Sequence, residues 1–265
     1  MKIIIIKLSG KALNEFTSNE EYANMLKKIG CIYDGVILVH GAGKLISEWS
    51  EKLNVKSEFI EGQRRTTPEV MEVVAAVQSG LTNAKITSYL SSKNFNVTGL
   101  TGIDRNLFVA EYINDKLGYV GIPKPNGNIN WLKELLADKV IPVFSSVCRD
   151  KVGNLMNVNA DVFTKELAIL VKAHTVLFVS DVEAININGK NLNEISSKEI
   201  LQGIKNGHIS GGMIPKLESS LELLNNTIKK IWVGNSLPAF EFNSKELHNK
   251  YGTWIIKSNK VIFGQ

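Results

Sequence analysis

Cysteine and histidine are scarce in this sequence, whose 265 residues include two cysteines and four histidines. Neither Cys31 nor Cys148 lies in a metal-ligand spacing, which argues against a zinc site. Two cysteines are also too few for a disulfide framework. We therefore expect free thiols in a reducing compartment, and a cytoplasmic protein.

Long apolar runs are missing as well. The β-branched run at the N-terminus spans only residues 3–6. A membrane-spanning helix needs about 20 such residues, and a secretory signal would add a cleavage site that is absent here. The sequence predicts no association with a membrane.

Dense clusters of one charge are absent too. The net charge is +5, and the basic pairs Lys27-Lys28, Arg64-Arg65 and Lys229-Lys230 are isolated from one another. A nucleic-acid-binding protein would carry a denser basic stripe. We expect no nucleic-acid partner, and a small basic excess suits an enzyme with anionic small-molecule ligands.

What the sequence does contain is an alternation of short β-branched runs with helical patterns, which predicts an α/β fold. The expected fold is a three-layer α/β/α sandwich with a mainly parallel open central sheet. Strands are expected at 3–6, 35–40, 94–98, 140–144, 175–179 and 228–233, and helices at 43–53, 66–91, 127–137, 161–172, 197–206 and 213–226.

Two segments interrupt this alternation. Residues 108–122 and 144–156 are short alternating runs around turn residues, which is typical of β-hairpins. Inserted into an α/β chain, such hairpins suggest a lid or a pocket wall. We expect two lobes that share one sheet, residues 1–173 and residues 174–265.

Four short turns follow predicted strands or open predicted helices. They are Lys7-Leu-Ser-Gly10, His40-Gly-Ala-Gly43, Ser180-Asp-Val-Glu-Ala184 and Gly211-Gly-Met-Ile-Pro-Lys216. Ligands of open parallel sheets bind at the carboxyl ends of the strands, and glycine turns let backbone N–H groups approach a phosphate. The second turn is neither a Walker A loop nor a dinucleotide fingerprint, so each turn alone also fits a tight connection.

Charged and amide side chains accompany these turns. Lys7 ends a strand and Lys216 begins a helix, where each is either a solvated lysine or a cation for a migrating phosphoryl group. The stretch Asn157-Val-Asn-Ala-Asp161 either caps a helix or binds carboxylate and amide groups. Arg64 and Arg65 are either solvated or ready to pair with a carboxylate.

Taken in order, these motifs resemble the amino acid kinase family. The set is Lys7-Leu-Ser-Gly10, Val39-His-Gly-Ala-Gly43, Gly62-Gln-Arg64, Gly99-Leu-Thr-Gly102, Leu155-Met-Asn-Val-Asn-Ala-Asp161, Ser180-Asp-Val182 and Gly212-Met-Ile-Pro-Lys216. The resemblance implies a sandwich of the carbamate kinase type. Within the family, the set is most similar to enzymes that use ATP and Mg²⁺ to phosphorylate the γ-carboxylate of N-acetyl-L-glutamate.

The resemblance also implies site residues. Lys7 and Lys216 would stabilise the transferring phosphoryl group, and Asp161 would orient both lysines. Gly41, Ala42, Gly43, Arg64, Asn157 and Asn159 would bind the substrate. The ATP-binding residues would be Lys7, Gly10, Ser180, Asp181, Val182, Glu183, Ala184, Ile185, Asn186, His208, Ile209, Ser210, Gly212 and Lys216, with Mg²⁺ carried by ATP rather than by a protein metal site.

The resemblance leaves several questions open. Ser9, Ala42 and Ala184 stand where the family usually has glycine, and their N–H donors survive if these positions are not left-handed. The chain looks like the arginine-insensitive homodimeric type, paired through its first lobe. The alternatives are a kinase of aminoadipate or glutamate attached to a carrier protein, for which Arg65 speaks, and a non-catalytic ATP-binding regulator.

Overall fold

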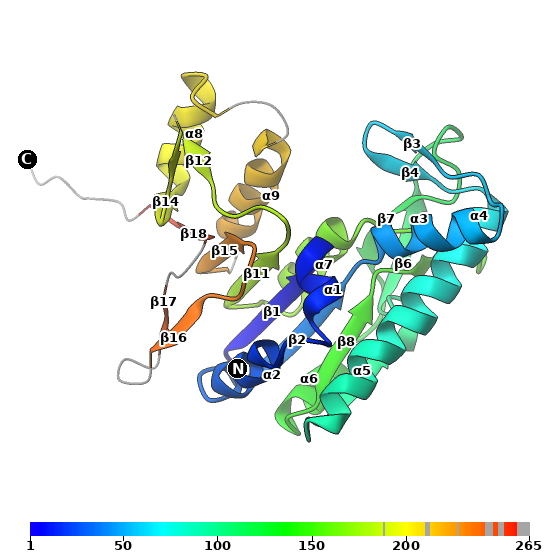
Figure 1. Cartoon of the computed structure of the whole chain (residues 1–265), viewed down its shortest axis with the longest axis horizontal. Helices are drawn as coiled ribbons and strands as arrows, with labels where there is room; N and C mark the ends of the chain where they lie inside the picture. Colours follow the sequence, from blue (N-terminus) through cyan, green and yellow to red (C-terminus); the bar gives the residue numbers. More distant parts are fainter. Residues whose placement is uncertain (188, 210–212, 227, 242–245, 249–251, 259–265) are drawn as a thin grey trace, which may run out of the picture.

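The computed structural model describes residues 1–187, 189–209, 213–226, 228–241, 246–248 and 252–258. Its centre is an eight-stranded sheet in the order β14-β18-β15-β11-β1-β2-β8-β5 (Figure 1). Its strands are β1 (Ile3–Leu8), β2 (Gly35–His40), β5 (Val97–Leu100), β8 (Ile141–Ser145), β11 (Thr175–Val179), β14 (Glu194–Ser196), β15 (Lys230–Gly234) and β18 (Gly252–Ile256). The neighbours from β15 to β5 are parallel, and β18 is antiparallel to β15.

Helices cover both faces of this sheet, because every residue of β1 and β2 is buried and alternate side chains point to opposite faces. Ile3 and Ile5 share one core with helices α6, α7, α8 and α9, whereas Ile4 and Ile6 share another core with α1, α2 and α5. The three-layer fold class is therefore confirmed. The helices are α1 (Gly10–Glu15), α2 (Glu20–Gly30), α3 (Gly43–Lys52), α4 (Pro68–Val74), α5 (Asn83–Ser92), α6 (Asn130–Ala137), α7 (Ala160–Leu170), α8 (Ser197–Lys205) and α9 (Met213–Asn225), with a short 3₁₀ turn η2 (Asp104–Asn106).

The long predicted helix is present but not uniform. Thr67 caps its start, with Pro68 in the first turn, and the helix runs through α4, a π-helical segment η1 (Ala75–Thr82) and α5. Figure 1 shows this helix lying along the edge of the first half of the molecule. The sequence pattern predicted its length but not its π turn.

Among the described residues, four smaller sheets lie outside the central sheet. A four-stranded sheet has the order β10-β9-β6-β7, and two-stranded hairpins pair β3 with β4, β12 with β13, and β16 with β17. Their bounds are β3 (Glu58–Ile60), β4 (Gln63–Arg65), β6 (Phe108–Tyr112), β7 (Gly121–Pro125), β9 (Cys148–Arg149), β10 (Leu155–Met156), β12 (Asn186–Ile187), β13 (Lys190–Asn191), β16 (Ala239–Glu241) and β17 (Glu246–His248). Within the described ranges, no helix is both long and apolar enough to cross a membrane.

Several predicted boundaries need correction. The strand expected at 94–98 begins at Val97, because residues 91–94 still form the closing turn of the preceding helix. The hairpin expected at 144–156 begins at Cys148, since Phe144 is a central-sheet residue paired with Leu100. Helices α1 and α2 were missed. Strands of residues 1–173 and of residues 174–265 meet where β1 pairs with β11, which is the junction of the two proposed lobes.

Candidate functional site

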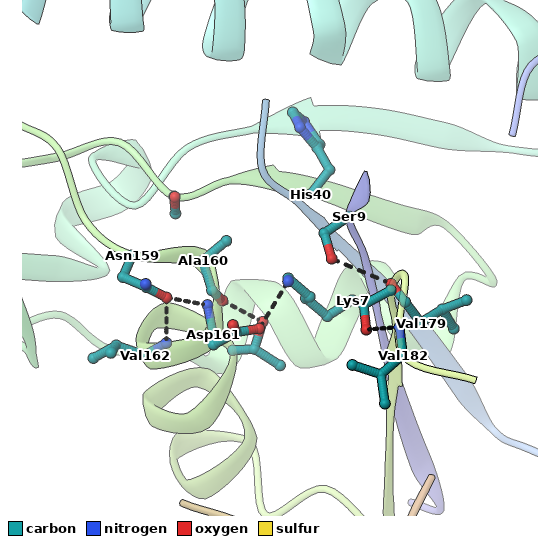
Figure 2. Close-up of polar contacts among 12 residues, drawn as sticks. Lys7, Ser9, His40, Asn159, Ala160, Asp161, Val162, Val179 and Val182 are labelled. Atoms are coloured by element: carbon teal, nitrogen blue, oxygen red, sulfur yellow. Dashed lines mark hydrogen bonds and ion pairs between the residues drawn. The ribbon is translucent and has the colours of Figure 1, made fainter. Parts of the chain in front are cut away.

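The centre of the candidate site is an ion pair at the carboxyl end of β1. Lys7 is 6% exposed, and its Nζ lies 2.8 Å from Oδ1 of Asp161, which is in the first turn of α7. Figure 2 shows the Lys7 side chain reaching from the strand to the helix N-terminus. A lysine is rarely buried to this degree unless it is paired, so the solvated alternative is wrong for Lys7.

The turn between β2 and α3 presents free backbone donors. Ala42 occupies the N-cap position of α3 and has no side-chain acceptor, so no side chain caps the first N–H groups of this helix. Its φ is −158°, which is not left-handed. Uncapped N–H groups at a helix N-terminus favour an anion. This turn can therefore hold a phosphoryl group or a carboxylate.

The segment 157–161 caps helix α7 and also lines the site with polar side chains. Asn159 accepts hydrogen bonds from the backbone N–H groups of Asp161 (2.7 Å) and Val162 (3.4 Å), so it is the cap of α7 (Figure 2). Asn157 donates through Nδ2 to Thr66 Oγ1 at 3.0 Å. The capping alternative therefore holds for Asn159, while its Nδ2 donors are not used by the cap.

Arg64 is the second buried cation of the site. It is 8% exposed and donates to the carbonyl of Gly43 and to Ser47 Oγ, each at 2.8 Å, and also to Ser57 Oγ. These acceptors are all neutral, and burial lowers the pKa of the guanidinium. Among the residues that the structure describes, no carboxylate pairs with Arg64, and its charge is met by these neutral oxygens and by the face of the Phe59 ring, whose centroid lies 4.7 Å from the guanidinium carbon.

These groups line one cavity of about 440 Å³. The cavity is bounded by the carboxyl ends of β1 and β2, the start of α3, the β3–β4 hairpin and the start of α7. Its lining residues are Lys7, Ser9, Gly41, Ala42, Gly43, Lys44, Ile46, Ser47, Phe59, Gly62, Gln63, Arg64, Gln78, Val120, Ser146, Asn157, Val158, Asn159, Ala160 and Asp161. The structure thus brings together Lys7, Asp161 and all six predicted substrate-binding residues.

The turn after β1 is held by a residue from the second half of the chain. Gly10 has a φ of +54°, and a Cβ there would clash with the carboxylate of Asp181. That carboxylate accepts a hydrogen bond from the backbone N–H of Lys11 at 2.7 Å. Asp181 thus fixes the β1–α1 turn and leaves no room for a side chain at Gly10.

The other predicted ATP-binding residues are spread along the edge of the second half. Asp181, Glu183, Asn186 and His208 are exposed, Ala184 and Val182 are half-buried, and Ser180 Oγ accepts from the N–H of Val182 at 3.3 Å. The Ile185 and Ile209 side chains lie in the core, and their backbone N–H groups donate to Thr253 Oγ1 and to the carbonyl of Gly203, respectively. Ser210, Gly212 and the Lys216 side chain lie outside the described residues.

The positions where the family usually has glycine tolerate their side chains here. Ser9 has a φ of −150°, and neither Ala42 nor Ala184 is among the described residues with positive φ. The backbone N–H groups therefore survive these replacements, because left-handed geometry is the only reason that would demand glycine on conformational grounds.

Sequence reasoning gave no role of their own to four polar residues around the site, although His40 lies within a predicted motif. His40, Gln78, Asn83 and Ser146 are all buried, and Gln78 and Ser146 also line the cavity. Burial lowers the pKa of His40 to about 4. The available signal was the pair of amides, Gln78 and Asn83, within an otherwise apolar helical stripe, because buried amides need partners.

A mainly parallel sheet with a cavity at its carboxyl edge, two helix N-termini and two buried cations defines a class, the α/β proteins that bind anionic substrates. Residues 2–235 match the model of the amino acid kinase family, and the chain belongs to that family.

Similar proteins agree with this assignment. The chain is 34% identical over 262 residues to an acetylglutamate kinase of Bacillus pumilus, with 98% of this chain and 99% of the relative covered. A solved structure from Streptococcus mutans matches with a TM-score of 0.73 at 25% identity, covering 96% of this chain and 98% of the other. Carbamate kinase from Giardia shares the fold, with a TM-score of 0.66 at 18% identity over 97% of this chain and 99% of that one.

Proposed function

We propose that this chain transfers the γ-phosphoryl group of ATP to the γ-carboxylate of N-acetyl-L-glutamate, as a step of arginine biosynthesis. The products are ADP and N-acetyl-L-glutamyl 5-phosphate. The attacking carboxylate is already ionised at neutral pH, so the reaction needs no protein base. Catalysis is then alignment of the two substrates and neutralisation of charge in the transition state.

One observation carries this proposal. Two buried cations, Lys7 and Arg64, line one cavity, and they differ in whether a carboxylate of the protein neutralises their charge. Lys7 has the Asp161 carboxylate at 2.8 Å, whereas the described partners of Arg64 are neutral oxygens and the Phe59 ring. A dicarboxylate substrate supplies the missing charge to Arg64 with one end. Its other end then lies with the γ-phosphoryl group near Lys7 and the uncapped start of α3.

The proposed roles follow from this arrangement. Lys7 neutralises the migrating group from the first half of the chain, and Asp161 fixes its position. The N–H groups of Ala42 and Gly43 hold phosphoryl or carboxylate oxygens, and Gly41 lines the same turn. Asn157 and Asn159 bind the amide side of the substrate.

The second half of the chain supplies the ATP site in this proposal. Helix α9 runs from the carboxyl edge of the sheet back to the start of β15, which is parallel to β11. In this proposal Lys216, in the first turn of α9, supplies the second neutralising cation at the ATP phosphates. ATP brings its Mg²⁺ as part of the substrate, and the part of the chain that the structure describes has no cluster of three His, Cys, Asp or Glu side chains fit for a metal.

The division of labour is part of the same proposal. Residues 1–173 bind the acylated amino acid and form a homodimer in the cytoplasm, and residues 174–265 bind ATP. Titration of ATP into variants of residues 174–265 tests the ATP site. The molecular mass of the protein in solution tests the homodimer.

The carrier-protein alternative loses its residue-level support. Arg65 donates to Glu58 at 2.9 Å on the outer side of the β3–β4 hairpin and does not line the cavity. An ADP-release assay with N-acetylglutamate, N-acetylaminoadipate and glutamate tests the choice. Turnover with N-acetylglutamate supports the proposal. Turnover with N-acetylaminoadipate alone would make that compound the substrate instead. ATP binding without turnover of any of the three would make the chain a non-catalytic regulator.

A further inference from the structure

The π-helical segment η1 places two amide side chains over the ends of two strands. In an α-helix with 3.6 residues per turn, positions five apart lie about 140° apart around the axis. The i→i+5 bonding of a π turn brings such positions toward one face, and here the N–H of Asn83 bonds to the carbonyl of Gln78. Thus Gln78 and Asn83 both reach the carboxyl ends of β2 and β8.

Gln78 connects both walls of the cavity. It is 3% exposed, and its Nε2 donates to Ser146 Oγ at 2.7 Å and, more weakly, to the carbonyl of His40 at 3.5 Å. Ser146 Oγ in turn donates to the carbonyl of Val158 at 2.6 Å. One side chain therefore ties the β2–α3 turn to the segment 157–161, which carries Asn157, Asn159 and Asp161.

The direction of these bonds fixes the orientation of the amide. A carbonyl can only accept, so the Ser146 hydroxyl proton points to Val158 and Ser146 Oγ must accept from Gln78. The NH₂ end of Gln78 is thereby turned toward Ser146 and His40, both of which are acceptors. No donor faces another donor in this relay of Gln78, Ser146 and Val158. Its hydrogen bonds therefore fix a single arrangement, and the relay acts as a rigid strut between the two segments rather than as a loosely packed polar cluster.

Asn83 supports the same turn from the side. His40 Nδ1 lies 3.0 Å from the carbonyl of Gly41, so it carries the ring proton, and Nε2 accepts from Asn83 Nδ2 at 3.0 Å. The same Nδ2 group donates to the carbonyl of Val143 at 2.8 Å. The start of the Gly41–Gly43 turn is thus held on its His40 and Gly41 carbonyls, and the Gly41 N–H donates to the carbonyl of Leu8. The N–H groups of Ala42 and Gly43 are the ones that face a ligand in the proposed function.

We propose that Gln78 is a positioning residue for phosphoryl transfer. Through Ser146 it holds the Lys7–Asp161 wall at a fixed separation from the uncapped N-terminus of α3. The reacting groups of the two substrates lie between these walls in the proposed function, on which this inference rests. Because a misplacement of about 1 Å can cost roughly 10²-fold in rate, loosening the strut acts on turnover rather than on substrate affinity.

The test compares Gln78→Met with Ser79→Ala. Ser79 lies on the same π turn and bonds to Ser145 Oγ at 2.7 Å, but it does not line the cavity. At a temperature where each variant is fully folded, we expect Q78M to lower kcat by about 10²-fold with KM for ATP within roughly twofold, and S79A to match the wild type. Ser146→Ala, which breaks the relay one bond later, should reproduce the Q78M loss and serves if Q78M does not fold.

Amide hydrogen exchange of the substrate-free protein gives a second readout that does not depend on the identity of the substrate. Residues 41–44 and 157–161 should exchange faster in Q78M, and in S146A the increase should appear at 157–161, with no change in S79A. Unchanged kcat, or unchanged exchange at 157–161 in a folded relay variant, would overturn the inference. A wild-type enzyme without turnover of N-acetylglutamate would instead refute the proposed function. The exchange result would then decide by itself whether Gln78 holds the two segments in place.

Discussion

Arg64 and Arg65 are neighbours in sequence but point to opposite sides of the β3–β4 hairpin. The guanidinium of Arg64 enters the cavity and donates to the carbonyl of Gly43 at 2.8 Å, whereas that of Arg65 pairs with Glu58 at 2.9 Å on the outside. Strand alternation explains the contrast, since successive side chains point to opposite faces. One arginine is thereby available to a substrate carboxylate and the other is not.

Arg64→Ala should raise KM for N-acetylglutamate by about 10- to 100-fold, which corresponds to a charge-assisted hydrogen bond. Steady-state kinetics with saturating ATP measure the effect. Arg65→Ala is the matched control in the same hairpin and should leave KM within about twofold, because exposed ion pairs contribute little. Equal effects of the two substitutions would contradict the inward role of Arg64.

Lys7→Ala should lower kcat by about 10²- to 10³-fold with a much smaller change in KM, because the cation acts on charge that develops in the transition state. Lys11→Ala is the control, since its side chain is 76% exposed and pairs with Glu15 on the surface. A single-turnover assay separates chemistry from product release. Near-normal turnover of the Lys7 variant would remove it from the reaction.

Gly10 and Gly43 should respond to alanine in opposite ways. Gly10→Ala places a methyl at a φ of +54° and against the Asp181 carboxylate, so the free energy of unfolding should fall by roughly 2 kcal/mol or more. Gly43 has open space at its Cβ position and lines the cavity. Gly43→Ala should therefore keep its stability and lose turnover, which urea denaturation and the ADP-release assay distinguish.

His40 should make stability depend on pH. Burial lowers its folded-state pKa to about 4, below the value of about 6.5 in an unfolded chain. Between these values the unfolded state binds more protons, so the His40 contribution is complete above pH ~6.5 and is lost as pH falls toward 4, by about 3 kcal/mol in total.

The comparison of wild type with His40→Gln isolates this contribution from that of His174, whose pKa burial also lowers. Urea unfolding at several pH values between 4 and 7 should show a steeper decline for the wild type than for H40Q. Parallel pH profiles would mean that folding leaves the pKa of His40 at its unfolded-state value.

Much of the fold followed from local pattern. The buried runs of β1, β2 and β11 and the start signal Thr66-Thr-Pro-Glu69 sufficed to place the strands and the long helix, although the cap is Thr67 rather than the Thr66 that stands three residues before Glu69. Strand order also put Lys7 and the Gly41–Gly43 turn at one edge of the sheet. Helix α1 was not predictable in the same way, because its six residues carry no complete apolar period and Asp181, 170 positions away from Lys11, satisfies its start.

The sequence by itself determined the family, the sheet and the set of residues that gather at its carboxyl edge, because these depend on short periodic patterns and on motifs read within a few residues. The tertiary structure decided the inward turn of Arg64, the neutral His40 and the Gln78–Ser146–Val158 relay. Each of these depends on contacts between distant segments. Burial and hydrogen-bond geometry, which set the charge and orientation of such groups, arise only when those segments pack together.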